Sequence, residues 1–86
     1  MKTDIINVIE VIDNTVTSVE SFILPNSKMK AYKKVIEDAE NLFIEKAKEN
    51  EMSDDESEGA LDDGYYKNGD YTVYLSWSSN VFKFDK

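Results

Sequence analysis

The chain has 86 residues, of which 41% are hydrophobic and 33% charged, and its formal net charge is −8. It contains no cysteine and no histidine, and all ten basic residues are lysines. These absences exclude disulfides, thiolate or imidazole metal ligands and arginine clamps on phosphate. We therefore expect a single domain over residues 1–86 that is not an enzyme, with no catalytic residue, no cofactor and no metal site.

The first segment predicts a helix over residues 4–23. Its apolar residues recur at spacings of three and four, which place them along one side of a helix. Every one of them is β-branched, a class that favours strands, but the spacing holds for five consecutive steps and we give it more weight. The stripe consists of Ile5, Ile9, Ile12, Val16, Val19 and Ile23.

A second helix is predicted over residues 27–50. Apolar residues from Met29 to Ala47 form the broad face typical of a helix that covers a core. Pro25 separates the two predicted helices, since proline disfavours helix in the residue before it. Because the connection is short, we expect an N-terminal antiparallel helical hairpin.

The C-terminal segment predicts a small β-meander over residues 65–85. Tyr71, Val73, Leu75 and Trp77 alternate with polar residues and Tyr74, which is the period of a strand with one buried face. Asn68-Gly69 and residues 78–80 are turn signals, so the meander has two or three antiparallel strands. The expected fold class is α+β, with the helical hairpin first and the meander after it.

Most of the excess charge lies between the second helix and the meander. Residues 51–64 contain seven acids and no lysine. The acids are Glu51, Asp54, Asp55, Glu56, Glu58, Asp62 and Asp63. Ser53 and Glu56 have the spacing of a helix capping box, whereas Gly59 and Gly64 oppose a long helix. An EF-hand loop starting at Asp54 lacks its last ligand, because Tyr65 stands at the twelfth position.

This acidic segment has two interpretations. It is either a solvated loop that keeps the chain soluble, or a mimic of a nucleic-acid backbone that fits a basic phosphate-binding cleft. In size, acidity and lack of catalytic residues the chain resembles the small accessory proteins of phages and mobile elements that block host nucleases. That resemblance implies a non-enzymatic, DNA-mimic-like inhibitor of anti-restriction or anti-CRISPR type, acting in the host-cell cytoplasm.

We therefore predict a partner that is a basic nucleic-acid-binding protein or nuclease. The predicted partner-binding residues are the seven acids of residues 51–64 together with Tyr65 and Tyr66. The net charge argues against direct binding of nucleic acid or of an anionic membrane, and no secretory signal or bilayer-spanning apolar run is visible. One alternative is an immunity or antitoxin protein that caps a toxic nuclease. Another is a helical homodimeric scaffold or regulator that pairs through Ile5, Ile9, Ile12, Val16 and Val19.

Overall fold

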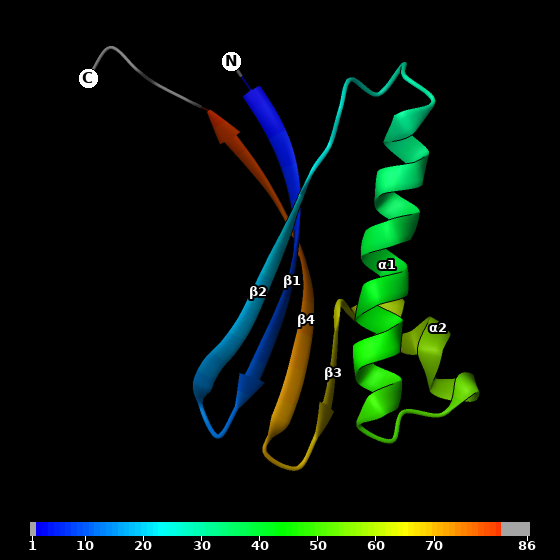
Figure 1. Cartoon of the computed structure of the whole chain (residues 1–86). Coiled ribbons are helices and arrows are strands. Elements are labelled where there is room, and N and C mark those ends of the chain that lie inside the picture. Colours follow the sequence, from blue (N-terminus) through cyan, green and yellow to red (C-terminus); the bar gives the residue numbers. More distant parts are fainter. Residues whose placement is uncertain (1, 82–86) are drawn as a thin grey trace.

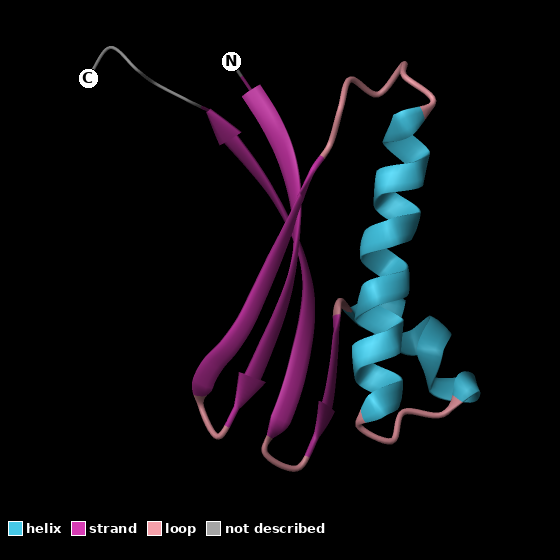
Figure 2. Ribbon diagram, viewed as in Figure 1, coloured by secondary structure: helices cyan, strands magenta, loops and turns pink. Residues whose placement is uncertain are grey.

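The structure, a computed structural model, describes residues 2–81. It contains one four-stranded antiparallel sheet and two helices (Figures 1 and 2). In chain order these elements are β1 (Lys2–Ile12), β2 (Thr15–Ile23), α1 (Ala31–Glu49), α2 (Asp54–Asp63), β3 (Tyr65–Asn68) and β4 (Tyr71–Val81). Both helices lie on the same side of the sheet, so no described element covers its other face (Figure 2).

The strand order in the sheet is β2-β1-β4-β3, which places the first and the last strands next to each other in the centre. Two tight turns close the sheet at one end, at Asp13-Asn14 and at Gly69-Asp70. Asp13 and Asn14 have φ angles of 52° and 62°. Both angles lie in the left-handed region that the commonest hairpin turn requires, and Asp and Asn tolerate that region better than other non-glycine residues. Local sequence chemistry thus specifies the first hairpin.

The core lies between the covered sheet face and α1. Alternate residues of the central strands point toward the helix, and Ile6, Val8 and Val73 are fully buried there. Phe43 of α1 packs into the same cluster and is also fully buried. The rest of the buried apolar cluster consists of Leu24, Ala39, Ala47, Met52, Ala60, Tyr71 and Leu75.

The predicted helix over residues 4–23 is wrong, because this segment forms the β1–β2 hairpin. Steps of four residues are even, so they keep a side chain on one face of a strand as well as on one side of a helix. Two steps within the strands are odd. The step from Ile9 to Ile12 places Ile12 beside Tyr71, on the opposite face of β1 from Ile9. The step from Val16 to Val19 spans a β-bulge that restores the match: Val16 pairs with Val11, and Val19 pairs with Ile9. The bulge therefore imitates a helical step, and the β-branched composition was the better guide.

The predicted fold class is wrong as well. The chain has no N-terminal helical hairpin followed by a meander, because the sheet is built from a hairpin before the helices and two strands after them. The turn predicted at residues 78–80 is absent, since β4 runs without interruption to Val81. The closing strand predicted after that turn falls largely outside the described residues. On β4, Tyr71, Val73 and Leu75 are buried toward α1, whereas Trp77 is half exposed.

The helix predicted over residues 27–50 is present in shorter form as α1. The Asn26 side chain, before the helix, accepts a hydrogen bond from the backbone N–H of Lys28 at 2.9 Å. The N-cap of α1 is Lys30, without a side-chain cap. The residues between β2 and α1 therefore form a turn of their own before the helix begins.

Candidate functional site

The acidic segment contains a short helix, α2, with sequence signals at both ends. The predicted capping box is present: the carboxylate of Glu56 accepts a hydrogen bond from the backbone N–H of Ser53 at 3.0 Å. At the other end Gly64 has a φ of 80°, and its N–H donates to the carbonyl of Ala60 at 2.8 Å. Glycine suits this left-handed C-terminal position. Residues 54–63 are therefore an ordered helix and not a solvated loop.

All six acidic side chains of α2 are exposed. Three of them, Asp55, Glu58 and Asp62, are spaced so that they follow one line along the helix, on the side opposite to the buried Ala60. A ten-residue helix is ~15 Å long, so it carries about one carboxylate per 2.5 Å. One strand of DNA carries a charge every ~3.4 Å along its axis. The charge density of α2 therefore matches or exceeds that of a nucleic-acid strand.

Helix stability explains only part of this charge. Acids in the first turn are favourable because the N-terminal end of a helix is electrostatically positive, and Asp54 also pairs with Lys48. The hydrogen bond from Lys48, with its charge, holds the pKa of Asp54 below its ordinary value. Asp62 and Asp63 occupy the opposite end, where negative charge is unfavourable. No ion pair among the described residues offsets their repulsion.

A groove of about 440 Å³ lies between α2 and β3. Carboxylates from the helix and two tyrosines from the strand line it, namely Glu56, Asp63, Tyr65 and Tyr66, and Lys67 lies at its edge. The hydroxyl of Tyr66 donates to the carbonyl of Asn50 at 3.3 Å, which fixes the ring against the loop before α2. Burial raises the pKa of Tyr66, and the charges of Glu56 and Glu51 raise it further. The hydroxyl thus stays a neutral donor near the acidic helix.

The structure brings together most of the predicted partner-binding residues. Six lie on α2, and four of the nine line the groove. Glu51 is exposed in the loop before α2 and lines no part of the groove. Tyr65 also reaches the uncovered sheet face, where its ring centroid lies 6.3 Å from that of Tyr74. The acids and tyrosines therefore form one continuous surface at the β3 edge of the molecule, which we call the acidic surface.

A polar cluster between the sheet and α1 was not predicted from the sequence. Glu10 of β1 accepts hydrogen bonds from Lys46 of α1 at 3.0 Å and from the Tyr71 hydroxyl at 2.7 Å. Burial alone would raise the pKa of Glu10, but these two bonds and the Lys46 charge outweigh it and lower that pKa. The three residues come from distant parts of the chain, so no local pattern could reveal them. These two hydrogen bonds connect α1 and β4 to β1, so we assign the cluster a structural role.

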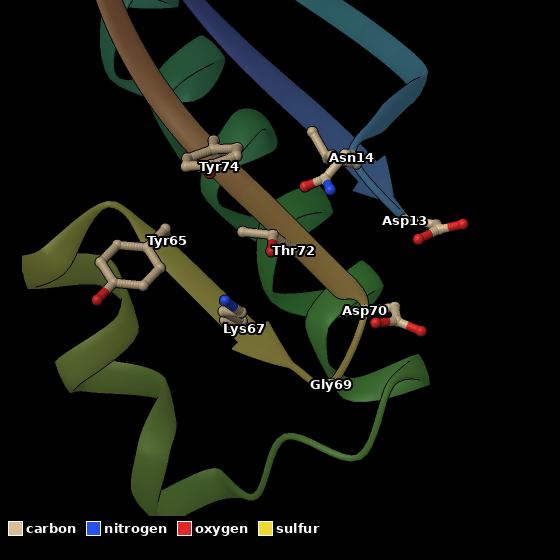
Figure 3. Close-up of a pocket in the computed structure, with 9 residues that line it drawn as sticks. Asp13, Asn14, Tyr65, Lys67, Gly69, Asp70, Thr72 and Tyr74 are labelled. Atoms are coloured by element: carbon tan, nitrogen blue, oxygen red, sulfur yellow. The ribbon is translucent and has the colours of Figure 1, made fainter.

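The uncovered sheet face has an open cleft of about 410 Å³ beside the two turns (Figure 3). Its lining includes Tyr65, Tyr74, Thr72 and Lys67 from β3 and β4. The carboxylates of Asp13 and Asp70 also line it, at the two turns. Across residues 2–81 no group of three or more carboxylates is placed to hold a metal ion.

The chain matches no protein-family model, no curated protein and no solved structure. Neither α1 nor α2 combines the length and the apolar composition that crossing a bilayer requires.

Proposed function

We propose that this protein is a non-enzymatic inhibitor that occupies the phosphate-binding cleft of a nucleic-acid-handling protein. The observation that carries the proposal is the groove between α2 and β3, where Glu56 and Asp63 stand beside Tyr65 and Tyr66. Carboxylates next to aromatic faces suit a lysine or arginine side chain, which gains an ion pair and a cation–π contact together. Such side chains line the clefts that hold nucleic acid.

The exposed row of Asp55, Glu58 and Asp62 supplies the second part of the interaction. Its carboxylates are exposed and form no ion pair among the described residues, so a partner meets them without first breaking internal bonds. Because the capped helix already orders their backbone, only the side chains lose conformational freedom on binding. We expect this row to accelerate association with a basic cleft and the tyrosines to slow dissociation.

The test starts from nucleic-acid-binding proteins that the immobilised chain captures from a bacterial lysate. Binding of each purified protein is then measured against the wild type and against the triple variant Asp55→Asn, Glu58→Gln, Asp62→Asn. At about 0.5 kcal/mol for each exposed charge pair, the triple variant should bind about tenfold more weakly, mainly through a slower association rate. Added salt should weaken binding, and a DNA duplex should compete with the chain.

The matched control is the triple variant Glu37→Gln, Glu45→Gln, Glu49→Gln on α1. It changes the net charge by the same amount at three exposed positions on another helix. The proposal requires near-normal binding by this control. Equal losses in the two triple variants would show that only net charge matters, and undiminished binding by the α2 variant would remove the acidic surface from the interaction.

A further inference from the structure

The uncovered face of the sheet is unusually apolar for a surface. Residues that pair across the strands share one face, and on this face apolar rows lie on either side of a polar row of Ser21, Asn7 and Ser76. One row crosses all four strands and consists of Val19, Ile9, Tyr74 and Tyr65. Val19 is 54% exposed, and Ile23 on the same edge strand is 65% exposed. Exposed valine, isoleucine and tyrosine side chains gathered in one row are typical of an interaction surface.

Charge selects the partner for this face. Of its described strand residues only Lys67 is charged, whereas the carboxylates of α1, α2, Glu10 and Glu20 lie on the covered side or in the helix layer. A basic protein that docked on this face would therefore contact no carboxylate of the described strand residues, apart from those of the two turns. Although the chain has a net charge of −8, a second copy meets no array of like charges on this neutral face.

We propose that two copies of this chain associate face to face through the uncovered sheet face. Stacked sheets pack ~10 Å apart, so the two helix layers and their carboxylates lie on opposite outer sides of the dimer. A two-fold axis along the strand direction places β2 of one copy over β3 of the other. Val19 of β2 then packs on Tyr65 and Tyr74 of the second copy. The dimer covers Tyr65 and leaves Tyr66, on the helix side of β3, and the carboxylates of α2 to the partner of the proposed function.

The same arrangement pairs the remaining charges. Lys67 on β3 comes next to the β1–β2 turn of the second copy, where Asp13 is exposed. Neither side chain forms an ion pair within its own chain among the described residues. The symmetry gives two such pairs, one at each edge of the interface.

The area is sufficient for a reversible dimer. With strands ~4.8 Å apart and a rise of ~3.3 Å per residue, nine residues in each of the three long strands plus the four of β3 cover about 500 Å² per copy. Two copies thus bury about 1,000 Å², which is the lower limit for a specific interface. We therefore expect dissociation in the micromolar range and a monomer at high dilution.

Sedimentation equilibrium of the full chain over a wide concentration range tests the proposal. The wild type should form dimers, and Val19→Glu should weaken dimerisation at least ~30-fold, because it places an unpaired charge against the tyrosine side chains of the second copy. Met29→Glu is the matched control: Met29 is 56% exposed in the loop before α1, so the same change in charge and polarity occurs outside the face. Circular dichroism and thermal unfolding verify that both variants are folded.

The charge pair has its own measurement. Lys67→Gln and Asp13→Asn should each weaken the dimer about 2- to 5-fold, and the double variant should be no weaker than either single one. A wild type that stays monomeric throughout the range, or a folded Val19→Glu that dimerises as the wild type does, would overturn the proposal. Independent, additive effects of the two charge variants would overturn the paired arrangement on which it is built.

Discussion

Replacement of Glu10 by Gln tests how strongly the polar cluster fastens α1 to the sheet. The variant keeps the size of the side chain and an acceptor for the Tyr71 hydroxyl, but removes the charge that pairs with Lys46. The two side chains are only 17% and 18% exposed, so water cannot replace the lost partner fully. Hydrogen bonds to charged groups contribute about 1.5–3 kcal/mol, so we expect the free energy of unfolding to fall by about 2 kcal/mol.

For a domain of this size that loss corresponds to a decrease in Tm of about 8–16 °C, which is measurable by circular dichroism together with urea unfolding. Lys46→Met alone should cost a similar amount, because it leaves a largely buried carboxylate without its cation. The double variant should be less destabilised than the sum of the two single ones by at least ~1 kcal/mol. Additive losses, or a loss below about 0.5 kcal/mol for Glu10→Gln, would show that the pair is not coupled and would refute this account.

The stability difference between the wild type and Glu10→Gln should depend on pH. The pKa of Glu10 is lowered in the folded protein from its ordinary value of 4.5, so its charge stabilises the fold at every pH above that value. This contribution is lost as the pH falls through the lowered pKa of the folded state. The stability difference between wild type and Glu10→Gln should therefore be constant above about pH 5.5 and shrink steadily below pH 4.5. A difference that persists undiminished at about pH 2 would assign the effect to packing instead of charge.

Two further pairs of substitutions test which isoleucines of β1 are buried and where α2 ends. Ile6→Ala removes a fully buried side chain and should lower the free energy of unfolding by about 2–5 kcal/mol. Ile12→Ala changes a position that is 46% exposed and should lower it by less than about 1 kcal/mol. If urea unfolding gave the reverse order, it would contradict the strand assignment of this segment. Gly59→Ala should stabilise the protein by about 0.5–1 kcal/mol, since it lies inside α2 with nothing within 4 Å of an added Cβ. Gly64→Ala should destabilise the protein by more than about 1 kcal/mol, because Gly64 has a φ of +80° and an added Cβ would lie 3.3 Å from the carbonyl oxygen of Leu75. Equal effects of the two substitutions would show that α2 does not end at Gly64.

Local signals in the sequence indicate part of α1, whereas for residues 51–64 the sequence analysis left open whether they form a helix or a loop. A capping box and a C-terminal glycine act over a few residues, so Ser53, Glu56 and Gly64 define the short helix without help from the rest of the chain. The clustering of acids is likewise a property of the sequence alone. Its proximity to Tyr65 and Tyr66 follows from the short connection between α2 and β3.

The sheet could not be predicted in the same way, because its order depends on pairing between distant segments. The bulge near Val16 gave β2 a helix-like spacing, and only the left-handed turn at Asp13-Asn14 marked the hairpin. Had that turn been recognised, the β-branched residues Thr15, Val16, Thr17 and Val19 would have indicated a strand. The contact of Glu10 with Lys46 spans 36 positions and depends on which helix covers the sheet, so it leaves no local signal.

The central pairing of β1 with β4 has a consequence for how the chain folds during synthesis. While the ribosome is still making the second half, the first hairpin and α1 can form, but β1 has one hydrogen-bonding edge empty and the core lacks Val73 and Leu75. Contacts of such long sequence separation make folding slow, since the chain must close a large loop before it gains their energy. Until β4 emerges, the apolar hairpin exposes an edge that other chains can pair with. A nascent chain arrested before Tyr71 should therefore be protease-sensitive and prone to aggregation. A nascent chain in which Val81 has left the ribosome should resist proteolysis.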